Sequence, residues 1–254
     1  VVYFIANIKM TTLTLPFLGV VSLGWFSLPI TLIWILGITN AVNLIDGLDG
    51  LATGVAIIAL STSALTGYFF LNVTSTFISI MMATLVAALL GFLPYNFHPA
   101  KIYLGDTGSL FIGFMISVFS LYGLKNATFI TLIIPVIILG VPITDTLYAI
   151  LRRLLNKKPI SQADKHHLHH RLMQMGLTHR QTVLVIYGIA LIFSFISLLY
   201  PLSNLWGSIL LTVATLFGLE LFVEAIGLVG DTRQPLLNGI KYLVLKVSHL
   251  FEHR

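Results

Sequence analysis

Three polar segments interrupt an otherwise apolar chain, and their side chains are of the kinds that hold metal ions and phosphates. The first, NAVNLIDGLDGL at 40–51, has a polar residue at every third position: Asn40, Asn43, Asp46 and Asp49. On a regular helix a three-residue step drifts by about 60°, so the first and last would face opposite sides. The intervening glycines permit a tight turn instead, which would let both carboxylates converge with Asn43. We expect a functional site rather than a simple polar loop, because ionisable groups beside membrane-length apolar segments are costly.

The second polar segment, PYNFHPAKIYLGDTGS at 94–109, ends where another apolar stretch begins. The N-terminus of the helix expected there would present free N–H groups, which suit an anion. Thr107 or Ser109 could cap this helix, and Asp106 beside them could hold a hard cation such as Mg²⁺. Alone, Asp106 would be explained as a simple helix cap. Together with the two carboxylates of the first segment, it favours a site for Mg²⁺ and phosphate.

The third polar segment, SQADKHHLHHRL at 161–172, is rich in histidine. His166 and His170, four residues apart, could ligate zinc, so a zinc hydrolase is one alternative. However, no acid completes an HExxH arrangement, and Lys165 and Arg171 would repel a cation. Histidine, arginine and lysine together suit a phosphate better than a metal. A solvated basic loop would also account for them.

The composition indicates where these segments lie. Of 254 residues, 57% are hydrophobic and 9% are charged, with a mean hydropathy of +0.98. A soluble domain normally carries about 25% charged residues, so most of this surface faces something other than water. The chain has no cysteine, which excludes disulfides and thiolate metal sites.

Apolar stretches of roughly 17–25 residues are needed to cross a bilayer. Such stretches lie at 51–71, 76–93, 109–124, 128–150, 182–200 and 205–228, preceded by a shorter one at 27–39 and a remnant at 1–8. Proline, glycine, asparagine or charge separates them, as is typical of helix ends. No strand-like alternation competes with this pattern. We therefore predict an all-α, polytopic transmembrane bundle, with residues 1–254 forming a single integral membrane domain.

The basic residues predict the orientation. If the loop 40–50 is cytoplasmic, so are the loops 94–108 and 151–181 and the tail 229–254. These hold every histidine, and all of the 14 lysines and arginines except Lys9 and Lys125, as the positive-inside rule requires. The three polar segments thus meet at the cytoplasmic face. Anionic lipid headgroups explain the net charge of +5 without a nucleic-acid partner.

Three further acids lie within the apolar stretches. Asp145 is in the cytoplasmic half of its predicted span, where it is either structural or a contact to lipid headgroups. Glu220 and Glu224 share a helix face, and we expect interhelical pairing for both.

The three polar segments carry a family resemblance. NAVNLIDGLDGLATG at 40–54, PAKIYLGDTGSLFIGF at 99–114 and DKHHLHHRL at 164–172 resemble polyprenyl-phosphate N-acetylhexosamine-1-phosphate transferases. These bacterial membrane enzymes begin wall teichoic acid, O-antigen and related glycans, and phospho-N-acetylmuramoyl-pentapeptide transferase is a relative. The resemblance covers most of residues 40–180. The histidine motif reads H-x-H-H, with His167, His169 and His170, rather than the HHH of the pentapeptide transferases, which favours the UDP-N-acetylglucosamine branch.

The resemblance implies a reaction. A phosphate oxygen of undecaprenyl phosphate would attack the sugar-side phosphorus of UDP-N-acetylglucosamine in the bacterial cytoplasmic membrane, releasing UMP. An activity like that of the pentapeptide transferases is the alternative within the family, and a homodimer stays open. A membrane transporter, whose broken helices also point their ends at a site, is the rival from another class. A transporter site would usually lie near the middle of the bilayer.

The resemblance also implies residue roles. Asp106 would bind Mg²⁺, or Mn²⁺ as an alternative, with Asn43 as a second ligand and Asp46 nearby. Asp46, Asp49 and the histidines His167, His169 and His170 would form the catalytic group. The substrates would be held by Asn96, Lys101, Tyr103, Thr107 and Arg171, with Tyr103 stacking on uracil and Arg171 on phosphate.

One feature departs from the family pattern. Family members carry two consecutive aspartates on an earlier cytoplasmic loop, implicated in catalysis and metal binding. No acidic residue precedes Asp46 here. We therefore expect that roughly the first quarter to third of the family domain is missing from this chain.

Overall fold

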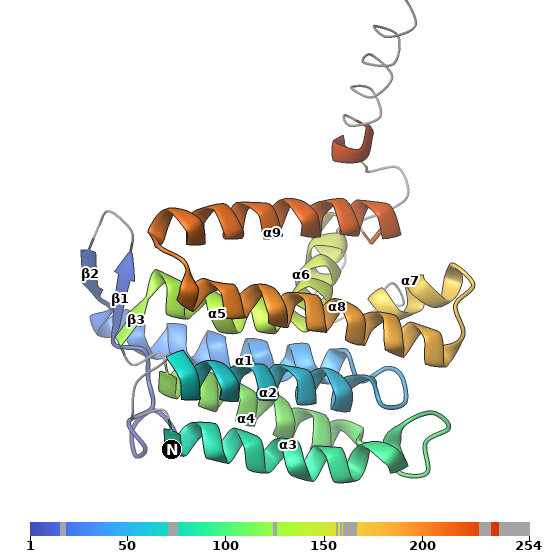
Figure 1. Ribbon diagram of the computed structural model, residues 1–254, viewed down its shortest axis with the longest axis horizontal. Helices are drawn as coiled ribbons and strands as arrows, with labels where there is room; N and C mark the ends of the chain where they lie inside the picture. Colours follow the sequence, from blue (N-terminus) through green and yellow to red (C-terminus); the bar gives the residue numbers. More distant parts are fainter. Residues whose placement is uncertain are drawn as a thin grey trace, which may run out of the picture.

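The computed structural model describes residues 1–15, 19–70, 76–123, 126–155, 157, 159, 167–228 and 235–238. The described part is an all-α bundle, as predicted (Figure 1). Six of its helices are long and apolar enough to cross a membrane: Gly24–Leu44, Leu51–Phe70, Thr76–Asn96, Gly105–Tyr122, His179–Leu202 and Leu205–Ile226. The chain is therefore a multi-pass membrane protein. The tail at 239–254 and the loop residues 161–166 lie outside the described residues.

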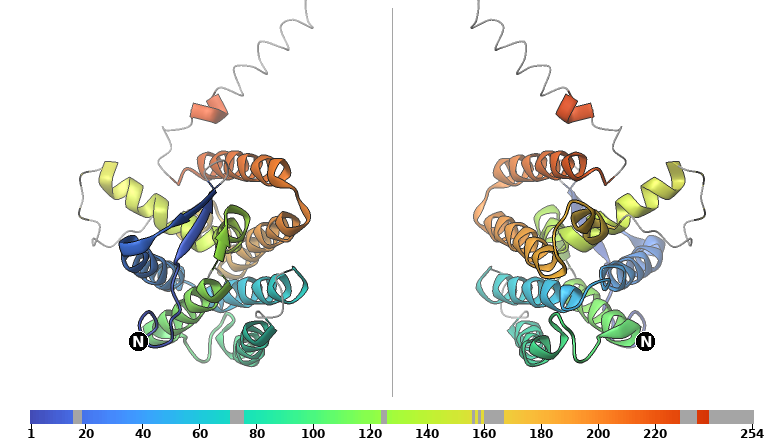
Figure 2. Two further views of the ribbon diagram at one scale, coloured as in Figure 1. Left: turned by 90° about the vertical axis from the view of Figure 1, so that its left-hand side faces the viewer. Right: turned by 90° about the vertical axis from the view of Figure 1, so that its right-hand side faces the viewer.

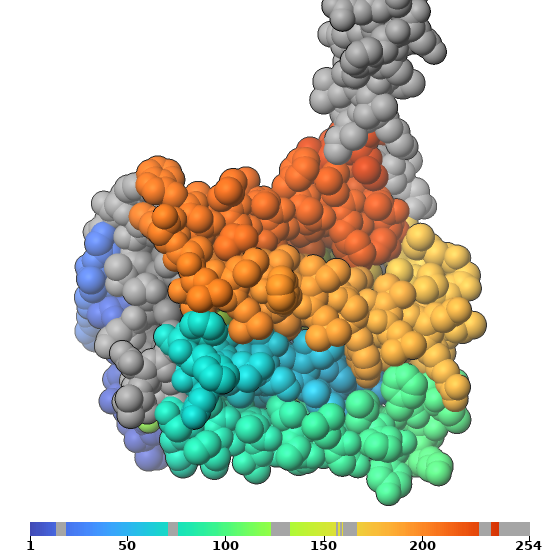
Figure 3. Space-filling model, in the orientation of Figure 1, coloured from blue at the N-terminus to red at the C-terminus, as the bar shows by residue number. Residues whose placement is uncertain are grey.

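The long helices run roughly parallel or antiparallel to one another in Figure 1. They are α1 (Ser27–Leu44), α2 (Leu51–Phe70), α3 (Thr76–Asn96), α4 (Gly105–Gly123), α8 (His179–Leu199) and α9 (Leu205–Ile226). The most enclosed is α2, which packs against α3 and α8, while α1 packs against α4. On the face shown in Figure 3, α8 lies between α2 and α9.

Small residues allow the close helix pairs, as is usual where helices meet in a membrane. Ala52, Ala56 and Ala59 of α2 are buried. On α4, a Cβ at Gly113 would lie 2.9 Å from the backbone of Thr39 of α1. A larger side chain at either place would push the helices apart.

The predicted span at 128–150 is wrong, because the helix breaks within it. It divides into α5 (Phe129–Ile138) and α6 (Gly140–Leu155). Pro142 has no N–H to donate to the Ile138 carbonyl, so the hydrogen-bond ladder is interrupted there. Gly140 also lies against α8, where a Cβ would be 2.9 Å from the Phe193 ring. As a result α6 runs steeply across the other helices and projects from the side of the bundle (Figures 1 and 2).

A small sheet, which the sequence did not predict, lies at one end of the bundle (Figure 1). Its strands β1 (Thr12–Leu15), β2 (Gly19–Ser22) and β3 (Asn126–Thr128) have the order β2-β1-β3. The β1 and β2 strands are antiparallel, and β1 and β3 are parallel. Residues 1–8 form turns rather than the expected remnant of a span.

Candidate active site at the polar end of the bundle

The first two polar segments and the described part of the third, residues 167–172, meet at the end of the bundle opposite the sheet (Figure 1). Because consecutive spans alternate in direction, α1 and α3 end here and α2 and α4 begin here. The short helix α7 (Leu168–Gln174), which carries most of the histidine motif, lies at the same end. Segments far apart in the chain are thus gathered at one end of the bundle.

The ends of α1 and α4 bring Asn43 and Asp106 together, as expected. The Asn43 amide nitrogen donates to Asp106 Oδ1 at 3.1 Å and to Ser109 Oγ at 2.8 Å. The expected cap by Thr107 or Ser109 is wrong, because α4 begins at Gly105 and both residues lie inside the helix. The Ser109 hydroxyl donates back to the Gly105 carbonyl at 3.0 Å. Asp106 lies exposed in the first turn of α4.

Asp46 lies on the turn between α1 and α2 and is partly buried. Burial, followed by the negative charges of Asp106 and Asp49, raises the pKa of Asp46 to about 6. Three carboxylates whose charges repel one another in this way fit a divalent cation, since a cation would relieve the repulsion. Carboxylate and amide oxygens are also the ligands that Mg²⁺ prefers. Asp46 and Asp106, with Asn43 beside them, are the residues that would hold it.

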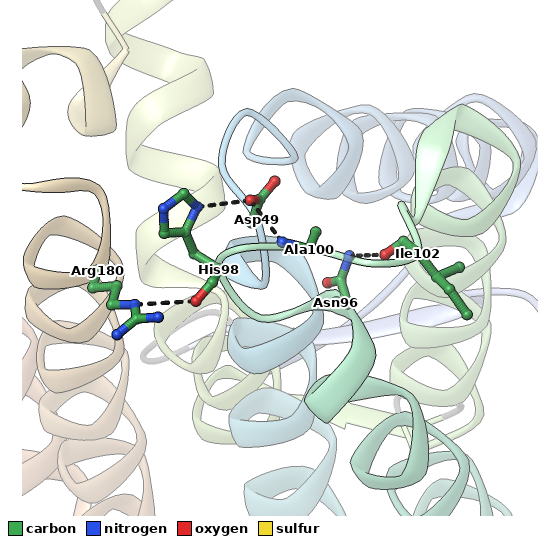
Figure 4. Close-up of polar contacts among 6 residues, drawn as sticks. All are labelled: Asp49, Asn96, His98, Ala100, Ile102 and Arg180. Atoms are coloured by element: carbon green, nitrogen blue, oxygen red, sulfur yellow. Dashed lines mark hydrogen bonds and ion pairs between the residues drawn. The ribbon is translucent and has the colours of Figure 1, made fainter.

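Asp49 binds the α3–α4 loop (Figure 4). Its Oδ2 atom is 2.8 Å from His98 Nδ1 and accepts from the Ala100 backbone N–H at 3.1 Å. Burial raises the pKa of Asp49, but these two hydrogen bonds, together with the charges of His179 and His98, set the pKa below its ordinary value. On the other side of the loop, Arg180 Nε donates to the His98 carbonyl at 3.1 Å.

Asn96 supports the same loop from beneath. Only 3% of it is exposed. Its Oδ1 accepts from Thr53 Oγ1 at 2.7 Å, and its Nδ2 donates to the Ile102 carbonyl at 3.0 Å. Both ends of its amide thus have protein partners, and the predicted contact of Asn96 with substrate stays a prediction. Lys101 and Tyr103 lie exposed on the loop that it shapes, with 74% of Tyr103 accessible.

The histidine motif packs against the aspartate segment. His169 is 3% exposed, and a Cβ at Gly47 would lie 2.5 Å from its Cε1 and Nε2 atoms. Glycine is therefore required at 47 because the His169 ring approaches so closely. At Gly50 the reason is different, since its backbone has a positive φ of 79°. Burial, together with the neighbouring His170, lowers the pKa of His169 to about 4. His169 is thus a neutral imidazole near pH 7.

Arg171 and α6 hold the end of α9. Arg171 donates to the Gly227 carbonyl at 2.6 Å, and Arg152 of α6 donates to the carbonyl of Leu228. The expected role of Arg171 on phosphate therefore competes with a role in fastening α9. Glu220 accepts from the Tyr148 hydroxyl of α6, which confirms interhelical pairing for this acid.

Glu224 bonds differently, since its carboxylate accepts from the backbone N–H groups of Leu236 and Leu237 at 3.0 and 2.8 Å. Two of its partners are therefore backbone groups beyond α9.

Within the described residues, one group of three side chains has the proximity that a metal site needs: Asp49, His98 and His179, whose candidate ligand atoms lie within 4.8 Å of one another. The rings of His98 and His179 stack with centroids 4.1 Å apart. The predicted zinc alternative used His166, which lies outside the described residues. No role was predicted for His98 or His179 from the sequence, although His98 lies within the polar segment at 94–109 and His179 follows the segment at 161–172.

Comparison with known proteins places the chain in a family. Residues 1–124 match the family described as glycosyl transferase family 4. The chain is 48% identical, over 94% of its length, to a "Probable undecaprenyl-phosphate N-acetylglucosaminyl 1-phosphate transferase" of Bacillus subtilis (strain 168), of which it covers 66%.

Two more distant relatives agree with this. The chain is 36% identical, over 63% of its length, to a "Decaprenyl-phosphate N-acetylglucosaminephosphotransferase" of Mycobacterium leprae (strain TN), of which it covers 45%. It is 34% identical, over 74% of its length, to a "Phospho-N-acetylmuramoyl-pentapeptide-transferase" of Halalkalibacterium halodurans, of which it covers 56%. The chain thus spans about half to two thirds of the length of these relatives. With its membrane-spanning helices and its polar motifs gathered at one end, it belongs to glycosyl transferase family 4.

Proposed function

We propose that the protein containing this chain transfers N-acetylglucosamine-1-phosphate from UDP-N-acetylglucosamine to undecaprenyl phosphate. The observation that carries the proposal is the meeting of Asn43, Asp46 and Asp106 with the histidine motif at one membrane edge. The similarity to the Bacillus subtilis relative supports the same reaction. We place the protein in the bacterial cytoplasmic membrane with this end in the cytoplasm, and its product in the synthesis of surface glycans such as wall teichoic acid.

The reaction is a substitution at phosphorus. An oxygen of the lipid phosphate forms a bond to the sugar-side phosphorus of the UDP-sugar. The bond from that phosphorus to the bridging oxygen breaks, and UMP leaves with the electron pair. Both reactants are anions, so the site must bring negative charges together and stabilise them. Bound Mg²⁺, or Mn²⁺, would supply positive charge next to the diphosphate.

The residues of this chain would bind and orient the two substrates. The free N–H groups at the start of α4, beside Thr107, suit a phosphate oxygen. The exposed ring of Tyr103 can stack on uracil, with Lys101 next to it. Neutral His169 would hydrogen-bond to a phosphate oxygen rather than pair with it as a cation. The exposed apolar side chains of the spanning helices provide a surface for the polyprenyl chain.

The position of the polar residues argues against a transporter. Transporter sites lie near the middle of the bilayer on discontinuous helices, whereas these residues lie at the ends of α1, α3 and α4. A zinc hydrolase would need a ligand set within the histidine motif, and none is formed by its described residues.

The direct test is UMP release by the purified full-length protein in undecaprenyl phosphate micelles. We expect release with UDP-N-acetylglucosamine and Mg²⁺, and none after chelation. Release with UDP-N-acetylmuramoyl-pentapeptide instead would show the pentapeptide alternative. Stoichiometric zinc in the purified protein, lost on replacing His167 and His170 by alanine, would favour the hydrolase. Absence of UMP release with either sugar nucleotide would overturn the proposal.

A further inference from the structure

A buried carboxylate on α6 bonds to the start of the histidine helix. Asp145 is 3% exposed and lies in the first half of α6. Its Oδ2 is 3.0 Å from His167 Nδ1, and its Oδ1 accepts from the Leu168 backbone N–H at 2.8 Å. Both oxygens of one side chain are therefore used by two consecutive residues, 22 and 23 positions further along the chain.

The first of these bonds concerns the proton on His167. A carboxylate can only accept, so the Nδ1 atom that faces it must carry the proton. The hydrogen bond made by one imidazole nitrogen decides the state of the other. In neutral His167 this leaves Nε2 without a proton, as the nitrogen that can accept a proton from a protonated phosphate oxygen.

The second bond concerns the position of α7. His167 is the N-cap residue of this seven-residue helix, and its own side chain makes no capping bond. Asp145 supplies the missing acceptor from another helix, and its negative charge lies at the positive end of the helix dipole. The side chain that orients His167 therefore also fixes the backbone from which His167 projects.

The orientation of α6 fixes the position of Asp145 relative to His167 and Leu168. The break after α5 turns α6 across the bundle, and two contacts then fasten it to α9: Tyr148 to Glu220, and Arg152 to the Leu228 carbonyl. Asp145 lies on the same helix as both anchors. Asp145 therefore projects from a helix that hydrogen bonds to Glu220 of α9 and to Leu228 hold in place, which a residue on a free loop would not do.

We propose that Asp145 is a positioning residue for His167, holding the proton on Nδ1 so that Nε2 is presented to a substrate phosphate. This inference rests on the proposed function, in which the histidine motif meets the phosphates. It assigns Asp145 no contact with substrate. Residues that orient a metal-ligating histidine through its second nitrogen contribute about 10- to 100-fold to metal affinity or activity, and we expect an effect of this size here.

The activity test uses Asp145→Asn in the full-length protein. Asparagine has nearly the same shape and keeps an oxygen for the Leu168 N–H. Its amide nitrogen would then face His167 Nδ1 and force that atom to accept. We expect the turnover number for UMP release to fall about 10- to 100-fold, with a melting temperature close to that of the wild type. Glu220→Gln is the matched control, because it replaces another carboxylate that bonds α6 to a neighbouring helix by its amide, whose oxygen can still accept from the Tyr148 hydroxyl. It should leave turnover within about twofold.

A double-mutant cycle separates positioning from general support. In a His167→Ala background, Asp145→Asn should cost no more than about twofold, because the residue through which Asp145 acts has gone. An equal loss in both backgrounds would mean that Asp145 acts by another route, and would overturn the inference. A loss of less than about twofold in the wild-type background would do the same.

A spectroscopic measurement tests the inference independently of turnover. With ¹⁵N-histidine labelling, and His167→Gln to assign the signals, the shifts show whether Nδ1 of His167 carries a proton. We expect a protonated Nδ1 in the wild type and an unprotonated Nδ1 in Asp145→Asn. An unprotonated Nδ1 in the wild type would overturn the inference even if the protein releases UMP. A protonated Nδ1 in a protein that releases no UMP would instead overturn the proposed function.

Discussion

Residues of one type acquire different chemical states at the polar end of this bundle. Asp46 and Asp49 are three positions apart, yet the pKa of one is raised and that of the other is lowered. Burial, followed by the charges of Asp106 and Asp49, raises the pKa of Asp46, whereas hydrogen bonds from His98 and Ala100 lower that of Asp49 against the effect of burial. The environment of each carboxylate therefore indicates its role better than the motif does.

We predict that Asp106→Asn abolishes transfer in the full-length protein while leaving it folded in detergent. Asp106 lies exposed in the first turn of α4, next to Asn43. Removing one carboxylate ligand should cost several kcal/mol of transition-state stabilisation, on the order of 10³-fold in rate. UMP release measures the loss, and melting temperature checks the fold. Activity within a few-fold of wild type would show that Asp106 holds no metal.

A second prediction concerns pH in the presence of a chelator. Because the pKa of Asp46 is raised to about 6 from 3.8, the folded protein keeps a proton that the unfolded chain loses between about pH 4 and 6. The free energy of unfolding therefore falls as the pH rises from about 4 to about 6, and the full loss is present above that range. Asp46→Asn removes the charge, so its melting temperature should exceed that of wild type at pH 8 and match it near pH 4. After a discount for the partial exposure of Asp46, the expected gain in the free energy of unfolding of Asp46→Asn at pH 8 is about 1–2 kcal/mol.

Asp49→Asn is the control for this experiment, because its effect should have the opposite sign. The lowered pKa of Asp49 means that its charged form is stabilised by folding, so the variant should melt below wild type at pH 8. The interpretation fails if Asp46→Asn also melts below wild type at that pH. Added Mg²⁺ should remove the advantage of Asp46→Asn, since the cation stabilises the carboxylates that repel one another.

At the scale of elements, glycines and tyrosines determine how closely helices approach. Gly54 of α2 lies under the Tyr187 ring of α8, and the Tyr187 hydroxyl donates to the Gly50 carbonyl. That bond connects α8 directly to the turn that carries Asp49. The packing of α2 on α8 thus bears on the geometry of the site as well as on the core.

We predict that Gly54→Ala is destabilising by about 1–3 kcal/mol, because a Cβ there would lie 2.0 Å from Tyr187 Cζ. Gly91→Ala on α3 is the matched control. A Cβ at residue 91 meets nothing within 4 Å, so replacing a helical glycine there should be neutral or stabilising by up to about 1 kcal/mol. Melting temperatures in one detergent compare the two. Equal shifts in both variants would rule out the close contact.

The whole molecule has a polar end and a sheet end. Charged and histidine residues gather at the ends of α1 and α3, while β1, β2 and β3 lie at the opposite end (Figure 1). The substrates differ in the same way, since a nucleotide sugar is soluble and a polyprenyl phosphate is held in the membrane. A site at the membrane edge is accessible to both.

Because the chain has no cysteine, single cysteines can report this orientation. We expect a membrane-impermeant maleimide to label Lys101→Cys in inside-out vesicles and not in intact cells. Val20→Cys, on exposed β2 at the opposite end, should show the reverse. The positive-inside distribution of lysine and arginine is the physical reason. Labelling of both variants from the same side would contradict the fold as well as the orientation.

The sequence by itself determined the fold class, the ends of most spans and the meeting of three motifs at one edge. Each of these follows from local properties. The length of an apolar stretch predicts a span, proline or glycine predicts where it ends, and the basic residues predict on which side of the membrane each loop lies. The family followed from three motifs in order. The break between α5 and α6 was missed because an apolar run looks continuous in composition, although Pro142 and Gly140 lie within it.

Only the tertiary structure decided which side chains touch. Asn96 lies within a predicted binding motif, but Thr53 and the Ile102 carbonyl occupy both ends of its amide. Asp145 lacked an assigned role until the turn of α6 brought it to His167. Such pairings depend on the direction of a helix and on partners tens of positions away in the chain. A motif therefore establishes which chemistry is available at this membrane edge, and packing establishes which residue of each type is left to perform it.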